Sequence, residues 1–316
     1  MKVVIPGGSG QVGTVLARHF HSAGHEVLVL SRKPREAPWK VIAWDGETAA
    51  DAREPFESAD VVINLAGKTV NCRYTSANRA EILESRVRST RAVGSAIATA
   101  SRPPRVWLQA STATIYAHRY DAPNDETTGI LGGSEPDAPD TWRFSIDVAR
   151  SWEQTANEME TPRTRKVLMR SAMTMSPDRG GIFDTLLRLV RFGLGGRAGN
   201  GRQYVSWIHD QDFIRAIHWL IEREDIRGPV NLAAPAPLPY SEFMQALRRA
   251  WGMPIGLPAS EWMVELGTRL LGTESELVLK SRRVVPGLLL QQGFTFDYPA
   301  WPKAAADLSA RWRLLR

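Results

Sequence analysis

A glycine turn near the start of the chain constrains the fold more than any other feature. It has the pattern G-x-x-G-x-x-G and spans residues 7–13. A short β-branched segment at residues 2–5 precedes it, and apolar residues recur at helical spacing over residues 12–23. A second apolar segment follows at residues 27–30. A strand, a helix and a strand in this order form a βαβ unit with parallel strands, so the sequence predicts an α/β protein.

Glycines at the first strand–helix junction of a βαβ unit are typical of a dinucleotide-binding site. Glycine permits the tight turn, the close approach of backbone to a pyrophosphate, and the packing of helix on strand. The first N–H groups of the helix then point at the phosphates, where the helix dipole also favours an anion. An incidental glycine turn is the alternative. The residues expected to bind the cofactor here are Gly7, Gly10, Gln11, Val12 and Gly13.

The residues that close the second strand indicate which dinucleotide is bound. NAD sites usually place Asp or Glu here to accept a hydrogen bond from the adenosine ribose 2′-hydroxyl. This chain has Ser31, Arg32 and Lys33 instead. A serine can hydrogen-bond a phosphate, and the two cations can pair with it. We therefore expect NADP(H) to be preferred over NAD(H), with a basic surface loop as the alternative.

Two further segments are expected to extend the same site. Residues 41–44 predict a third strand with Asp45 at its carboxyl end, where ligands of parallel sheets gather. We expect Asp45 to border the adenine, and a plain turn residue is an equal alternative. Residues 60–67 predict a fourth strand whose end lets backbone pass beside the cofactor. The cofactor-binding residues expected there are Leu65, Ala66 and Gly67.

Composition excludes several classes of protein. The chain has 316 residues, of which 43 % are apolar and 23 % charged, as in globular proteins with a sizeable core. A single cysteine, Cys72, excludes disulfide frameworks and cysteine-rich zinc sites, and we expect no metal. No apolar segment approaches the ~20 residues of a membrane span. We expect a cytoplasmic monomer or homodimer with an unknown small-molecule substrate and no membrane partner.

The net charge of +6 is spread along the chain rather than clustered. Such a surplus usually marks solvated surface, and attraction to a phosphate-bearing ligand is a second interpretation. The sequence contains no RNP box or paired zinc ligands, so we do not expect nucleic acid as a partner.

Beyond the first βαβ unit, the chain resembles the extended, NAD(P)-dependent epimerase/dehydratase branch of the short-chain dehydrogenase/reductase superfamily. The glycine turn and Asn64-Leu65-Ala66-Gly67 match that branch in order and spacing. The segment from Ser111 to Tyr116 is similar to its Ser-Ser-x-x-x-Tyr segment. Residues 206–212 and 228–235 resemble one sub-family, the "epimerase family proteins" of largely unknown activity.

The resemblance implies a fold and a division of the chain. It implies a Rossmann-like, doubly wound parallel sheet with a smaller C-terminal substrate lobe. Residues 1–170 would mainly form the NADP(H)-binding domain, with some later strands returning to it. Residues 171–316 would mainly form the substrate lobe and a helical C-terminal region.

The resemblance also exposes a missing acid–base pair. Most of the superfamily carries Tyr-x-x-x-Lys on one helix, where the tyrosine transfers the proton and the lysine lowers its pKa. The matching positions here are Ser145 and Ala149, and neither can do this work. We therefore expect an NADP(H)-binding oxidoreductase- or epimerase-like protein with a non-standard active site. The alternative is a catalytically silent NADP(H) sensor.

Several side chains are candidates for the remaining roles. Ser111 and Thr112 match the position of the superfamily's active-site hydroxyl, and the alternative is that they bond backbone. Tyr116 is a candidate for proton transfer, although its counterparts are often structural. Arg170 is expected at the nicotinamide end of the cofactor, unless it pairs with a carboxylate.

Two residues of the later segments are expected to bind substrate. Arg202 follows a glycine-rich stretch and would attract an anionic group. His209 lies in the Trp-Ile-His-x-x-Asp segment, near the expected substrate lobe. Its alternative is a buried histidine bonded to Asp212 or to backbone.

Overall fold

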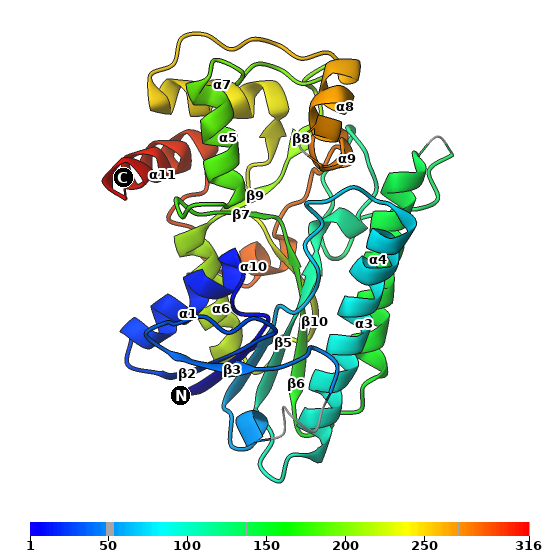
Figure 1. Ribbon diagram of the computed structural model, residues 1–316, viewed down its shortest axis with the longest axis vertical. Helices are drawn as coiled ribbons and strands as arrows, with labels where there is room; N and C mark the ends of the chain where they lie inside the picture. Colours follow the sequence, from blue (N-terminus) through cyan, green and yellow to red (C-terminus); the bar gives the residue numbers. More distant parts are fainter. Residues whose placement is uncertain (49–53, 137, 271, 316) are drawn as a thin grey trace.

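A seven-stranded parallel sheet forms the centre of the protein, in the order β3-β2-β1-β4-β5-β6-β10 (Figure 1). The computed structural model describes residues 1–48, 54–136, 138–270 and 272–315. The strands are β1 (Lys2–Pro6), β2 (Glu26–Ser31), β3 (Lys40–Ala43), β4 (Val61–Asn64), β5 (Val106–Thr112), β6 (Arg165–Ser171) and β10 (Gly228–Leu232).

Helices cover both faces of the sheet because both faces of its central strands are apolar. Along β1, Val3 and Ile5 face a core that contains residues of α1 (Gln11–Ser22), α6 (Asp210–Glu222) and α10 (Gly287–Gln291). Val4 points the other way, into a core shared with α3 (Ser76–Thr99) and α4 (Asp140–Glu158). Alternate strand residues thus feed opposite layers, and Figure 1 shows the two helix layers on either side of the sheet. The predicted doubly wound α/β fold is confirmed.

A second core lies beyond the carboxyl ends of the central strands (Figure 1). In it, Trp301 stacks on Phe243 with ring centroids 4.0 Å apart. The helices of this region are α5 (Ile182–Arg191), α7 (Tyr240–Trp251), α8 (Glu261–Leu270), α9 (Glu276–Leu279) and α11 (Trp301–Leu314). Its short strands are β7 (Met173–Met175), β8 (Tyr204–Val205), β9 (Trp207–His209) and β11 (Leu238–Pro239). A 3₁₀ turn, η1 (Ala113–Ile115), follows β5.

Two strand boundaries differ from the prediction. The third strand ends at Ala43 rather than at residue 44. The fourth strand ends at Asn64 instead of continuing to residue 67. The Asn64 side chain accepts a hydrogen bond from the Ala66 N–H at 3.1 Å and turns the chain out of the sheet there.

Within the described residues, none of the helices combines the length and the apolar composition that crossing a membrane requires.

Candidate functional site

A cavity of about 630 Å³ lies at the carboxyl edge of the sheet, where the strand order reverses between β1 and β4. Ligands of open α/β sheets bind at this kind of position. We call it the switch-point cleft. Nine of the residues predicted to bind a cofactor line it, and they are Gly7, Gly10, Ser31, Arg32, Lys33, Asp45, Leu65, Ala66 and Gly67.

The three glycines of the turn have different roles. Gly7 has φ +74°, and a Cβ there would lie 2.6 Å from the Ala66 Cα. A Cβ on Gly13 would lie 2.4 Å from the Gly8 Cα. These two glycines permit close backbone packing, and Gly13 does not line the cleft. A Cβ on Gly10 would meet only the Gly7 carbonyl oxygen, at 3.7 Å, so Gly10 leaves open the part of the cleft that a ligand needs.

The start of α1 fits a phosphate group. Gly10 is the N-cap residue, no side chain caps the helix, and its first turn carries no acidic residue. Helix starts leave backbone N–H groups without internal partners, here in the turn of Gln11, Val12 and Gly13. The buried Gln11 Nε2 also lacks a hydrogen-bond partner among the described residues. Neither Gln11 nor Val12 lines the cleft with its side chain, so their expected role rests on the backbone. An anion at this helix start would supply acceptors for the backbone N–H groups of this turn.

Basic side chains gather at the far end of the cleft, after β2. Arg32 is exposed and lies 4.0 Å from Glu81, and Lys33 is exposed beside it. Arg35, which we did not single out from the sequence, also lines the cleft. Ser31 is buried: its hydroxyl donates to Ser9 Oγ at 2.9 Å and accepts from the Lys33 N–H at 3.2 Å. Lys33 and Arg35 form no ion pair among the described residues and Arg32 has only the long contact with Glu81, whereas the serine hydroxyl holds the turn.

Asp45 has the turn role that was its alternative, and it also lines the cleft. Its carboxylate accepts hydrogen bonds from the Thr48 hydroxyl and from the N–H groups of Glu47 and Thr48, at 2.7 and 2.8 Å for the two backbone donors. These bonds, that of the Thr48 hydroxyl first, lower the pKa of Asp45.

A smaller cavity of about 220 Å³ adjoins the cleft at the end of β5, and we call it the inner cavity. Its walls come from the loop after β4 and from α3, β5, α4, α9 and the segment after α9. It borders the cleft directly, since a Cβ on Gly67 would lie 3.1 Å from Arg86 Cγ. Its lining residues are Val70, Tyr74, Ile82, Arg86, Ser111, Thr112, Thr114, Phe144, Ser145, Val148, Trp152, Glu276, Leu277 and Arg282.

Ser111 and Thr112, the two candidates for active-site hydroxyls, both line the inner cavity. The Ser111 hydroxyl donates to Glu153 Oε1 at 2.5 Å, so its partner is a carboxylate rather than backbone. The Thr112 hydroxyl accepts from the Thr114 N–H at 3.2 Å, which is the backbone alternative.

Arg170 and Tyr116 belong to a buried network behind the inner cavity. Arg170 donates to both oxygens of Glu153, at 2.8 and 2.7 Å, which is the carboxylate pairing considered from the sequence. Burial alone would lower the pKa of Arg170, but Glu153 raises it above its ordinary value. Tyr116 is 2 % exposed, accepts from Arg170 and donates to Asn231 Oδ1, both at 3.0 Å. Neither residue lines the cleft or the inner cavity.

The position of the missing tyrosine is occupied by a polar cluster. The Ser145 hydroxyl donates to Glu276 Oε2 at 2.5 Å, and the Tyr74 hydroxyl lies 3.5 Å from Ser145 Oγ. Burial raises the pKa of Glu276 and raises that of Tyr74 to about 12. Ala149, at the lysine position, is fully buried.

Sequence reasoning assigned no site role to four residues of this cavity: Tyr74, Arg86, Glu276 and Arg282. Three of them come from a loop or from the C-terminal region, with no motif to relate them to the strand ends. The exception is Arg86 on α3. The pair Ser85-Arg86 resembles a helix signature of the sub-family, but the role expected for it was packing on the sheet with a surface charge, and Arg86 instead lines the cavity.

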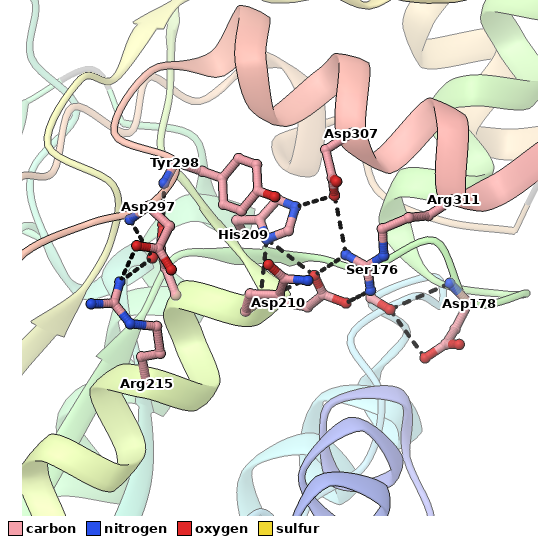
Figure 2. A network of polar contacts seen from close by, with 11 residues as sticks. Ser176, Asp178, His209, Asp210, Arg215, Asp297, Tyr298, Asp307 and Arg311 are labelled. Carbon is pink, nitrogen blue, oxygen red and sulfur yellow. Dashed lines mark hydrogen bonds and ion pairs between the residues drawn. The ribbon is translucent and has the colours of Figure 1, made fainter.

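His209 lies in a different network, which Figure 2 shows. It is fully buried and stacks on Tyr298 with ring centroids 3.8 Å apart. Its Nε2 bonds Asp307 at 3.0 Å, and its Nδ1 accepts from the Gln211 N–H, which caps α6. Burial lowers the pKa of His209. This is the buried-histidine alternative, with Asp307 as the partner rather than the expected Asp212.

Asp212 and Arg202 have separate roles. Asp212 accepts from the N–H groups of Asp297 and Tyr298, at 2.8 and 2.9 Å, and so fastens the segment before α11 to α6. Arg202 is exposed and is not among the residues that line the cleft or the inner cavity. Arg202 and His209, the two residues predicted to bind substrate, are therefore not brought to the site that the strand ends form.

Comparisons with known proteins agree with this architecture. Residues 3–233 match the family model "NAD dependent epimerase/dehydratase family", and residues 259–308 match a domain of unknown function, DUF1731. Epimerase family protein YfhF of Bacillus subtilis (strain 168) is 31 % identical over 313 residues, which is 98 % of each chain. Epimerase family protein MW0731 of Staphylococcus aureus (strain MW2) is 32 % identical over 308 residues, 96 % of this chain and 98 % of that relative.

Among solved structures, human epimerase family protein SDR39U1, crystallised with NADPH, superimposes with a TM-score of 0.84. It is 27 % identical, and the match covers 98 % of this chain and 99 % of that one. UDP-N-acetylglucosamine 4-epimerase from Bacillus cereus, at 16 % identity and a TM-score of 0.75, has the same fold.

Proposed function

Because the chain belongs to the NAD dependent epimerase/dehydratase family, we propose that it binds NADP(H) in the switch-point cleft and acts as an oxidoreductase or epimerase at the inner cavity. One observation carries the cofactor assignment. The open face of Gly10 and the uncapped start of α1 lie in the same cleft as three basic side chains after β2. That human relative, crystallised with NADPH, supports the same choice.

The cleft also contains acidic residues, but each of them has a partner. Glu81 pairs with Lys68 and lies near Arg32, and Glu47 pairs with Arg88 at 2.9 Å. Asp45 is held in its turn. Lys33 and Arg35 form no ion pair within the described part of the chain. The unpaired positive charge at this end of the cleft therefore favours a ligand with an additional negative charge, as the 2′-phosphate of NADP(H) provides.

When bound, the cofactor supplies hydride transfer, and the residues of the inner cavity would manage the proton. Ser111 and Ser145 both donate to carboxylates, at 2.5 Å in each case. The carboxylate of Glu153 is neutralised by Arg170 on both oxygens, whereas Glu276 lies 3.5 Å from Arg282. We propose that Glu276 accepts the proton through Ser145, in place of the absent tyrosine and lysine.

Titration of NADPH and NADH side by side tests the cofactor assignment. We expect NADPH to bind about 10- to 100-fold more tightly, and the double variant Arg32→Ala/Lys33→Ala to remove this preference while NADH binding is unchanged. Arg102→Ala is a matched control, because its side chain is 79 % exposed and lies outside the cleft. Equal affinity of the wild type for both coenzymes would disprove the preference.

A catalytically silent NADP(H) sensor is the second candidate, and the observation that favours it is Ser145 and Ala149 at the positions of the usual pair. The discriminating measurement is oxidation of NADPH across a panel of carbonyl compounds. Turnover that disappears in Glu276→Gln would support the enzyme, and tight NADPH binding without any turnover would support the sensor. The expected division at residue 170, the cytoplasmic location and the oligomeric state stay predictions.

A further inference from the structure

Arg86 has an unusual environment for a charged side chain. It lies on α3, half-buried, with its guanidinium carbon 4.8 Å from the centre of the Trp152 ring, and it lines the inner cavity. Its Nη1 donates to the Ile82 carbonyl oxygen at 2.8 Å. A guanidinium has five N–H donors, so most of its hydrogen-bonding capacity is unused by the described residues.

No carboxylate among the described residues pairs with Arg86. The groups that favour its charged form are the Tyr74 hydroxyl and the Cys72 thiol, and neither of them is a carboxylate. Burial lowers the pKa of Arg86 to about 10, so the side chain remains positive at neutral pH. An unpaired charge away from water is costly, and the contact with Trp152 offsets only part of that cost. A ligand anion would offset the rest.

Glu276, which also lines the inner cavity, does not neutralise the charge of Arg86. Arg282 donates to Thr114 Oγ1 at 3.2 Å and lies 3.5 Å from Glu276 Oε1, so the negative charge of Glu276 is shared with its own neighbour. Two guanidinium groups and one carboxyl line the cavity, which leaves one positive charge in excess.

We propose that the inner cavity binds a small carboxylate, and that Arg86 recognises its two oxygens and thereby determines substrate specificity. A carboxylate carries the single negative charge that balances the excess, and its planar pair of oxygens matches the fork of a guanidinium. The remaining walls near Arg86 include Val70, Phe144 and Val148, which suit an apolar body.

The size of the inner cavity limits the ligand. A volume of about 220 Å³ corresponds to roughly seven water molecules at ~30 Å³ each. A nucleotide sugar is far larger, whereas a carboxylic acid of a few carbons fits. Ser111 and Ser145 line the same cavity, so a ligand held by Arg86 would share it with both hydroxyls. The inference depends on the proposed function in one respect, since it takes the carboxylate to be the substrate.

Calorimetry on the full chain tests this, with acetate, butyrate and benzoate as probes, each beside its uncharged amide and each with and without NADP⁺. For the wild type we expect at least one carboxylate to bind in the range of roughly 1–10 mM, and its amide at least about tenfold more weakly. Arg86→Met should remove the difference between acid and amide. Arg86→Gln removes the charge but keeps a hydrogen-bond donor, and it replaces Arg86→Met if that variant does not fold.

The matched control is Arg88→Met on the same helix, because Arg88 is exposed and pairs with Glu84 and Glu47. It should bind the carboxylates as the wild type does. NADPH affinity is measured on every variant, and we expect Arg86→Met to keep it within about twofold.

Three results would overturn the inference: no carboxylate bound by the wild type, equal binding of acids and amides, or unchanged acid binding in Arg86→Met. A loss of NADPH affinity in Arg86→Met without loss of carboxylate binding would assign the guanidinium to the cofactor and also overturn it. Failure of the proposed function is a separate result. In that case the wild type would not bind NADPH, while Arg86-dependent carboxylate binding would persist.

Discussion

The glycine turn offers a substitution that separates cofactor binding from folding. In Gly10→Ala the new methyl group meets only the Gly7 carbonyl oxygen, at 3.7 Å. The backbone at Gly10, with φ −74° and ψ 172°, is open to any residue. The methyl group therefore fits the protein, but it occupies space in the cleft at the start of α1, where the proposed pyrophosphate would accept hydrogen bonds.

The expected losses follow from these contacts. A hydrogen bond to a charged group contributes about 1.5–3 kcal/mol, so losing one raises the Kd for NADPH about 10- to 150-fold. Alanine is a poorer N-cap residue than glycine by about 0.5–1 kcal/mol, which lowers the Tm by roughly 1–4 °C. In Gly13→Ala, by contrast, the methyl group would lie 2.4 Å from the Gly8 Cα, and such overpacking costs about 1–3 kcal/mol or more.

The assay is NADPH calorimetry together with thermal unfolding followed by circular dichroism, on both variants and the wild type. Gly10→Ala should lose affinity for NADPH and only roughly 1–4 °C of its Tm, and Gly13→Ala should lose more of its Tm. If Gly10→Ala folds normally and binds NADPH as the wild type does, the phosphates lie elsewhere and the assignment of the cleft is wrong.

Three further predictions concern buried polar groups. The ion pair of Arg170 and Glu153 has side chains that are only 8 % and 10 % exposed, and Arg170→Met leaves the Glu153 carboxylate without this partner. We expect urea denaturation to give a free energy of unfolding about 3–5 kcal/mol lower, and a loss below about 1 kcal/mol would contradict this. Tyr116→Phe should lower the free energy of unfolding by about 1–2 kcal/mol and leave NADPH affinity unchanged, and a loss of turnover without destabilisation would instead favour a role in proton transfer. The Nε2 atoms of His19 and His218 lie 2.9 Å apart, and burial lowers the pKa of both side chains. The unfolded chain therefore binds more protons than the folded chain just below pH 6.5, and the free energy of unfolding should fall as the pH drops from about 7 to 5. A Tm that is independent of pH in this range, or unaltered by His19→Gln, would refute that linkage.

Local sequence patterns were sufficient to predict the position of a residue where that residue acts through its own backbone or through its immediate neighbours in the chain. The glycine turn and the basic residues each lie directly after the strand that positions them, β1 and β2, and the structure places both at one cleft as expected. The glycines illustrate the limit of this reasoning. The motif predicts what glycines permit at such a turn, but only the packing of Gly8 against Gly13 and of Ala66 against Gly7 shows which two allow close packing and which one leaves space for a ligand.

Side-chain roles at the site depended on contacts between distant segments. Tyr116 follows β5 closely and Arg170 lies near the end of β6, so the sequence places both near the inner cavity. In the structure, both side chains belong to a buried network with Glu153 behind that cavity. Glu276 and Arg282 line the same cavity as Ser145 although they lie more than 120 positions after it in the chain. No spacing in the sequence predicts that they come together.

The amino-acid sequence alone determined the βαβ unit, the doubly wound sheet and the position of the cleft, because these follow from hydrophobic periodicity and from glycine's freedom near the strand ends. Only the tertiary structure decided which charges are neutralised. Pairing requires two groups within a few ångströms, and the chain brings such groups together by folding rather than by adjacency. Arg170 meets a carboxylate in this way, whereas Arg86 meets none among the described residues.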